Sequence, residues 1–285
     1  PKPDRPLRIL TFHNRTRQRE ACGRFFSCNS TITMAANDPP HILYQFHYSI
    51  CSIMVRYAFA LRGDAKDSAH EIRLKEESVD IVKAKEQLSE HYLCVPVLQS
   101  AAPVEKPISD SVEITKYLAG SYPTMIPKSH ERPIKQMLSD LHGVSFFAFT
   151  FAGKPQSIEG SKKTLEEKLA AGVSDTYRKA IETKLKRLDE SKLAALTPEA
   201  SKKNEQYTQQ LVSQLVSNLE ASKTGYLFGL ERPSALDAHL VVFVARMLDI
   251  KRDDMIPMQL KSYAEKAMGG KEWQDVMQGR RTVPG

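Results

Sequence analysis

Short apolar segments and one amphipathic helical pattern share the region from residue 41 to residue 82. Residues 41–48 are apolar and rich in aromatic side chains, which predicts a strand. Residues 50–61 carry apolar side chains three and four positions apart and precede Arg62-Gly63, which predicts an amphipathic helix that ends there. Apolar residues return at 72–74 and 79–82, which indicates a second strand region.

The same alternation continues to residue 122. A polar stretch at 83–91 has helical character, residues 93–98 form another short apolar strand segment that contains a proline, and residues 111–118 begin a helix. This order of strands and helices predicts a small α/β domain over residues 41–122.

Strand patterns disappear after the proline-containing break at 121–127. Apolar side chains then recur at helical spacing among many lysines and glutamates, in stripes at 165–188, 211–219 and 235–248. Gly172 predicts an interruption of the first stripe. We therefore expect an all-helical domain over residues 129–285.

The basic charge of the chain is concentrated at its start. The 285 residues include 41 lysines and arginines and 34 aspartates and glutamates, a net charge of +7. Seven of these basic residues and two of the acidic ones fall within residues 1–33, so the rest of the chain carries only +2. A nearly neutral body argues against a nucleic-acid-binding protein. No run approaches the roughly 20 apolar residues that a membrane span needs.

Residues 1–33 have the composition of an organelle transit peptide, rich in arginine and poor in acidic residues. The alternative, which we favour, is that translation starts at Met34 and that the upstream segment lies outside the protein. Either way we expect residues 1–40 to be a disordered basic leader or upstream extension. Four cysteines without a Cys-x-x-Cys pair indicate a reducing compartment, the cytoplasm or an organelle.

Ser49 stands where the first strand gives way to the first helix. A serine there is a good helix cap, and that structural role needs no further function. The functional interpretation is that its hydroxyl donates a hydrogen bond to a bound thiolate, because a helix N-terminus also lowers the pKa of a thiol.

Two further segments suit the binding of a peptide-like ligand. Pro96 inside a strand marks an edge or a cis turn; trans is favoured on base rates, but a cis bond would leave the Val95 backbone free to pair with an extended ligand. Asp110 and Ser111 precede an apolar helix, and either is an ordinary cap. Functionally, the Ser111 hydroxyl and helix amides would hold a carboxylate and Asp110 an ammonium, the two groups that a γ-glutamyl unit offers together. Ser234-x-x-Asp237 resembles a capping box and is a folding element only.

In this order the features resemble the glutathione transferase superfamily with a serine-class active site, over about residues 41–285. Residues 49–56 are similar to the Ser-x-Cys-Ser-x-x-Val-Arg run of the zeta class, and residues 95–98 match the cis-proline strand. Residues 110–118 match the Asp-Ser-x-x-Ile…Tyr-Leu glutathione motif, and residues 229–237 the capping motif of the helical domain.

The resemblance implies a thioredoxin-like N-terminal domain followed by an all-helical domain, with glutathione as co-substrate and a homodimer as the assembly. Glutathione would lie extended against Val95 and Pro96, with its γ-glutamyl end at Asp110 and Ser111 and its sulfur facing Ser49. The thiolate would attack a hydrophobic small-molecule electrophile, by conjugation or by reversible addition with cis–trans isomerisation. The long charged segment at 153–206 resembles insertions of fungal members, including those of secondary metabolism.

The chain departs from the family at Cys94, where a residue that holds the glycine carboxylate of glutathione usually stands. That contact would have to come from Lys83, Lys85 or His91. Cys51, in the first helical turn, competes with Ser49 as the reactive group, as in omega-type enzymes, or is a small packing residue.

For the acceptor pocket we expect Ile50 and the aromatic run with Phe147, Phe149 and Phe151, although helix packing is the more common use of such side chains. We find no metal-ligand spacing. The alternative function is a non-catalytic ligand carrier or assembly module with the same fold.

Overall fold

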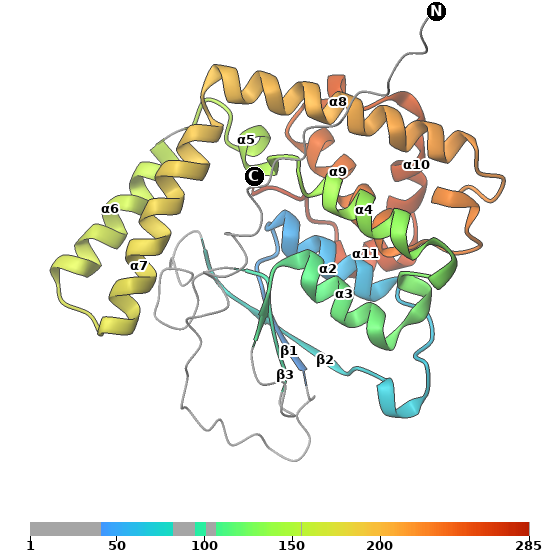
Figure 1. The fold of residues 1–285 in the computed structure, drawn as a ribbon, viewed down its shortest axis with the longest axis horizontal. Coiled ribbons are helices and arrows are strands. Elements are labelled where there is room, and N and C mark those ends of the chain that lie inside the picture. The colour runs from blue at the N-terminus through green and yellow to red at the C-terminus, as the bar shows by residue number, and fades with distance from the viewer. Residues whose placement is uncertain (1–40, 82–94, 101–106, 155, 285) are drawn as a thin grey trace, which may run out of the picture.

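The chain folds into a small sheet with covering helices, followed by a larger all-helical part (Figure 1). The computed structural model describes residues 41–81, 95–100, 107–154 and 156–284. The predicted fold class, a thioredoxin-like domain followed by an all-helical domain, is confirmed. The leader at 1–40 and the polar helix expected at 83–91 lie outside the described residues.

The sheet has four strands in the order β2-β1-β3-β4. β1 (His41–Gln45) is buried along its whole length and pairs in parallel with β2 (Leu74–Ser78) and antiparallel with β3 (Val97–Ser100). β4 (Ile108–Ser109) extends the antiparallel part. β2 lies between the two apolar segments in which we expected a strand. It is an edge strand with mostly exposed polar side chains, so it lacks the apolar pattern on which the expectation was based.

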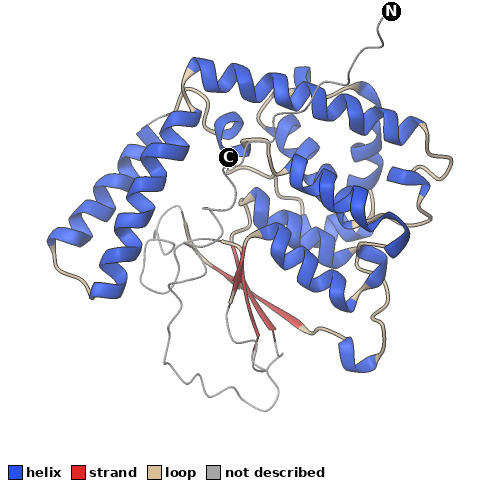
Figure 2. Ribbon diagram, in the orientation of Figure 1, coloured by secondary structure: helices blue, strands red, loops and turns tan. Residues whose placement is uncertain are grey.

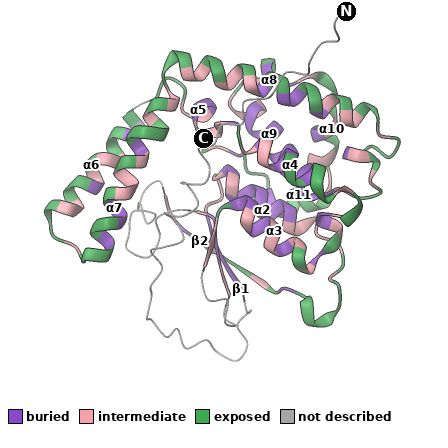
Figure 3. Ribbon diagram, viewed as in Figure 1, coloured by how far each residue is buried: buried purple, intermediate pink, exposed green. Residues whose placement is uncertain are grey.

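Helices α2 (Ile50–Ala60) and α3 (Ser111–Ser121) pack against each other, and α2 in turn packs against α9 (Ala235–Asp249) of the helical part. Residues from Ala235 to Met247 are all buried, which fits a helix that is apolar on every side (Figure 3). This contact joins the two parts into one continuous core.

Of the remaining helices of the body, two pack most closely on α9, and the others pack on these helices, on α2 or on each other (Figure 2). These remaining helices are α4 (Glu131–Leu141), α5 (Phe146–Thr150), α8 (Pro198–Glu220), α10 (Met258–Met268) and α11 (Lys271–Met277). Short 3-10 turns connect several elements, at Ser68–His70, Pro123–Met125, Lys128–His130, Leu227–Gly229 and Asp253–Met255.

A helical arm projects from the body at one side of the molecule (Figure 1). It consists of α6 (Gln156–Ala170), α7 (Asp175–Arg187) and a π-helical turn, η5 (Leu188–Leu193). Its buried apolar residues form a small core separate from the main one. Gly172, with φ of +83°, lies between the two helices, which confirms the predicted interruption.

The capping box at the start of α9 connects distant segments. The Ser234 hydroxyl accepts a hydrogen bond from the Asp237 backbone, and the Asp237 carboxylate accepts one from the Ser234 backbone at 2.8 Å. The same buried carboxylate accepts from the Leu227 backbone at 3.1 Å and from the Tyr263 hydroxyl at 2.5 Å. Asp237 thus holds the 3-10 turn at Leu227–Gly229 and α10 against α9.

We expect Asp237→Asn to lower the free energy of unfolding by about 2–3 kcal/mol, because an amide nitrogen would replace an acceptor that is buried and fully used. Ser234→Ala should cost about 1 kcal/mol, the usual value of a lost cap. Urea unfolding measures both. Ser213→Ala, on an exposed face of α8, is the control and should change stability by less than about 0.5 kcal/mol. An Asp237→Asn protein as stable as the original would contradict this role.

Candidate active site

Three chain segments meet at one end of the sheet. Because β1 and β3 are antiparallel, the start of β3 at Val97 pairs with Tyr44 near the end of β1. β4 is antiparallel to β3, and Ser109 at its end pairs with the same Val97. The residues that follow β1, precede β3 and follow β4 therefore lie close together.

Ser49 caps α2 at this end of the sheet, as predicted. Its side-chain oxygen accepts a hydrogen bond from the Ser52 backbone at 3.4 Å. The side chain is half-buried, and among the described residues its hydroxyl hydrogen has no acceptor. The hydroxyl is therefore able to donate to an anion at the positive end of the helix.

The Val95–Pro96 peptide bond is cis, the form that the family resemblance implies. Asp110 rather than Ser111 caps α3, accepting hydrogen bonds from the backbone of Val112 at 2.8 Å and Glu113 at 3.2 Å. The φ of Asp110 is +119°, and such strained backbone is common at binding sites. Asp110 is exposed, whereas Ser111 is buried.

Cys51 is a free thiol in the first turn of α2 that interacts with the Ser111 hydroxyl. Burial raises the pKa of this thiol, and the nearby Asp110 carboxylate raises it further. The hydrogen bond from Ser111 and the cations Arg246 and Lys192 act in the opposite direction without reversing the shift. Cys51 is therefore less ionised at neutral pH than an ordinary cysteine.

A buried arginine, Arg246 of α9, ties the start of α2 to the helical part. Its guanidinium donates to the Tyr48 carbonyl at 2.7 Å, to the Thr150 hydroxyl at 3.2 Å and to the Thr282 carbonyl at 2.5 Å. Burial lowers its pKa to about 10, so it stays charged at neutral pH. The peptide group that leads into Ser49 is thereby fixed by a cation.

The aromatic run divides between the main core, which holds Phe149, and the core of the arm, against which Phe147 packs. Phe149 is buried in the main core, with the Arg252 guanidinium 5.3 Å from its ring centroid, and Ile50 is buried there too. Phe147 and Phe151 are half-buried and stack with their ring centroids 4.6 Å apart. The ammonium of Lys192 lies 4.6 Å from the Phe147 centroid.

Other predicted residues fall where the structure gives no description. Lys83, Lys85, His91 and Cys94, the residues considered for the glycine carboxylate, lie outside the described residues. Within the described ranges, no group of three histidine, cysteine, aspartate or glutamate side chains is arranged to hold a metal ion. None of the described helices is long and apolar enough to cross a membrane.

Sequence reasoning missed Arg246 and Lys192. Arg246 did leave a signal, since it is a charged residue inside the apolar stripe of α9. Lys192 left none, because it is one of many lysines in a charged segment.

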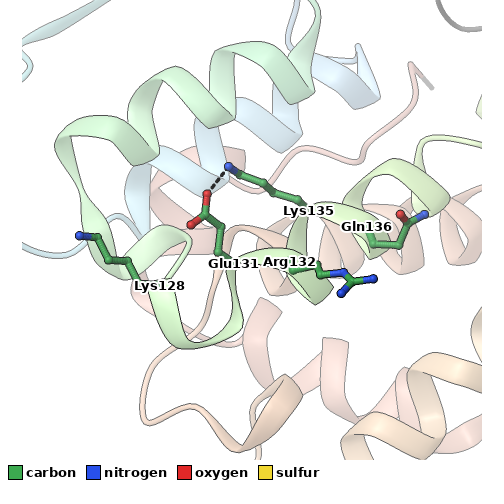
Figure 4. Close-up of a pocket in the computed structure, with 5 residues that line it drawn as sticks. All are labelled: Lys128, Glu131, Arg132, Lys135 and Gln136. Carbon is green, nitrogen blue, oxygen red and sulfur yellow. Dashed lines mark hydrogen bonds and ion pairs between the residues drawn. The ribbon is translucent and has the colours of Figure 1, made fainter.

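A shallow hollow elsewhere on the surface carries several charges but is separate from these residues. It lies at the start of α4 and is lined by Lys128, Glu131, Arg132, Lys135 and Gln136 (Figure 4). Glu131 forms an ion pair with Lys135, one helical turn away. Nucleophiles are absent from this set, so we place the candidate site at the end of the sheet.

Comparison with known proteins gives structural neighbours only. No protein-family model matches the sequence, and no curated protein is significantly similar to it. The structure is similar to glutathione transferase F2 from Populus trichocarpa, with a TM-score of 0.55 and 12% identity over 85% of this chain and 99% of that one.

Two further neighbours were solved with glutathione. A glutathione transferase family member from Pseudomonas fluorescens, with two glutathione molecules bound, has a TM-score of 0.53 and 12% identity over 85% of this chain and 94% of that one. Maleylacetoacetate isomerase from Anaeromyxobacter dehalogenans, with glutathione in its active site, has a TM-score of 0.52 and 13% identity over 85% and 96%. The architecture, the strand order and these neighbours agree, and the chain has the glutathione transferase fold.

Proposed function

We propose that this protein is a glutathione transferase that holds the thiolate of glutathione next to a hydrophobic electrophile. The observation that carries the proposal is the half-buried Ser49 hydroxyl, which caps α2 at the sheet end where the cis Val95–Pro96 bond and the Asp110–Ser111 cap also lie. The neighbours with bound glutathione and the motifs quoted above support the same ligand.

Glutathione would lie across this sheet end with each part meeting a matching group. The exposed Asp110 carboxylate would pair with the ammonium of the γ-glutamyl unit, and the Ser111 hydroxyl would turn away from Cys51 to donate to its carboxylate. The cysteinyl backbone would pair with that of Val95. The sulfur would then face Ser49, whose hydroxyl hydrogen has no described acceptor.

Activation of the glutathione thiol requires only a modest stabilisation of its thiolate by the protein. Lowering a thiol pKa by one unit takes about 1.4 kcal/mol of preferential stabilisation of the thiolate. One donated hydrogen bond, the end of α2 and the cation Arg246 are together sufficient for this. The thiolate then displaces a leaving group, or adds to an activated alkene and leaves again after bond rotation, which would isomerise the alkene.

Finer expectations accompany the proposal. An isomerase reaction has the support of the maleylacetoacetate isomerase neighbour, which shares only the fold. A role in secondary metabolism, a homodimer and a cytoplasmic location follow from the resemblance and the composition. The carrier alternative predicts ligand binding without turnover, and the experiment below separates the two.

The first experiment asks whether the protein is retained on immobilised glutathione and whether it accelerates the reaction of glutathione with 1-chloro-2,4-dinitrobenzene. We expect both. Ser49→Ala should lower kcat/KM about 100-fold, as for the loss of one hydrogen-bond donor to an anion. Ser49→Gly should lose as much activity but keep more stability, because glycine still caps a helix. Ser49→Thr should retain activity.

Cys51→Ala is the matched control for the nucleophile, and we expect it to keep most of the activity because the thiol pKa of Cys51 is raised. If instead Cys51→Ala abolishes turnover and Ser49→Ala spares it, the roles are reversed. Retention without turnover of any electrophile would favour the carrier.

Arg246 offers a second prediction, on pH dependence. Its positive charge stabilises a nearby thiolate, so the thiol pKa of bound glutathione should rise when the charge is removed. In Arg246→Met, the acid limb of the pH profile of kcat/KM, where activity rises as the thiol ionises, should therefore move to higher pH by about half a unit to one unit.

Arg246→Lys keeps the charge but not the set of hydrogen bonds to Tyr48, Thr150 and Thr282, so it should lower the Tm and leave the acid limb in place. Arg252→Met removes an arginine that is ion-paired with Glu205 and Asp254, and should not move the limb. An acid limb that stays fixed in a folded Arg246→Met protein would show that Arg246 has only a structural role.

A further inference from the structure

Lys192 is presented by an unusual piece of helix. It lies in η5, the π-helical turn of residues Leu188–Leu193 that follows α7 of the arm. Wide turns of this kind are rare inside helices and frequent at functional sites. The side chain is exposed, so a molecule in solution can reach it.

The ammonium of Lys192 is directed toward an aromatic surface of the body. It lies 4.6 Å from the centroid of Phe147, a ring that also stacks on Phe151 and packs against the apolar core of the arm. Phe147 belongs to α5, and Arg246 links Thr150 of the same helix to Tyr48, next to Ser49. Arg246 therefore connects the helix that carries Phe147 to the segment that leads into Ser49.

Electrostatic contacts place Lys192 on the same side as the candidate nucleophiles. Lys192 and Cys51 interact with each other, and the pKa of each responds to the other. Lys192 is exposed as a residue, but its ammonium lies close enough to the surrounding protein for desolvation to lower its pKa, an effect that Cys51 opposes. No carboxylate among the described residues is paired with it.

A second lysine of the arm adds to this positive potential. Lys184 lies on α7 and is half-buried. Burial, together with the cations Lys192 and Arg187, lowers its pKa to about 7, so about half of the Lys184 side chains are charged at neutral pH. Like charges repel, so a cluster of this kind favours a bound anion.

We propose that Lys192, with the stacked rings of Phe147 and Phe151, forms the acceptor subsite for an aromatic or other planar electrophile that carries a carboxylate. The half-buried ring of Phe151 would cover the apolar part of the acceptor, and the ammonium, held over Phe147, would pair with its carboxylate. This inference rests on the proposed function, since it names the class of electrophile that the thiolate of glutathione attacks.

Glutathione also carries carboxylates, so the carboxylate that pairs with Lys192 has two candidate sources, the acceptor and glutathione. We assign the subsite to the acceptor because Lys192 contacts Phe147 of the helical part, whereas the proposed glutathione groups follow β1, precede β3 and follow β4. The experiment separates the two sources by which Michaelis constant changes.

A matched pair of acceptors tests the subsite: 4-chloro-3,5-dinitrobenzoate and its methyl ester. In both, the thiolate of glutathione forms a carbon–sulfur bond at the ring carbon that bears chlorine, chloride leaves with the electron pair, and the thiol proton goes to solvent. Because the ester is the more activated ring, each kcat/KM is divided by the uncatalysed rate constant of the same acceptor.

We expect the wild-type protein to prefer the acid over the ester, and Lys192→Gln to reduce that preference about tenfold through KM for the acceptor. Lys192→Arg should restore it. Lys186→Gln, which removes an exposed lysine of the same arm paired with Glu190 at 3.8 Å, is the control and should leave it unchanged.

Binding of the two purified thioether products, measured by calorimetry, keeps the test independent of turnover. If the acid product binds more tightly than the ester product and Lys192→Gln removes the difference, the subsite stands even when catalysis is absent and the proposed function fails. Equal binding of both products, or a Lys192→Gln effect confined to KM for glutathione, would overturn the subsite and leave the proposed function intact.

Discussion

The guanidinium of Arg246 is the interaction on which the candidate site depends. It is a charged group inside an otherwise apolar helix, and burying a charge is costly unless its hydrogen bonds are made. Here they are made to backbone and hydroxyl oxygens of three separate segments, around Tyr48, Thr150 and Thr282. The cost of burial is thus offset by contacts that fix the start of α2 relative to α5, and a positive charge remains near Ser49.

Much of the fold was predictable because its signals are local. The amphipathic pattern of α2, the caps at Ser49 and Asp110, and the capping box at Ser234 each depend on residues within one helical turn. β2 was misplaced and β4 was missed for the opposite reason. A polar edge strand and a strand of two residues have no hydrophobic period of their own and exist only because a neighbouring strand pairs with them.

The candidate site was predictable only in the half that we propose binds glutathione. Its residues lie in short motifs whose order along the chain could be compared with a family, and the antiparallel register then brings them to one sheet end. The proposed acceptor side depends on pairs such as Lys192 and Phe147, which are far apart in the sequence and belong to different helical segments. Phe149 illustrates the same limit, because alternate residues of one short helix divide between the main core, which holds Phe149, and the core of the arm, against which Phe147 packs.

The separate core of the arm has an evolutionary consequence. Because α6 and α7 bury their apolar side chains mainly against each other, amino-acid substitutions in the arm have little effect on the packing around α9. Selection could lengthen, shorten or recharge this appendage at little risk to the part of the chain that holds the candidate site. Related chains that diverge most strongly between residues 156 and 193 would then differ in what they accept rather than in how they fold.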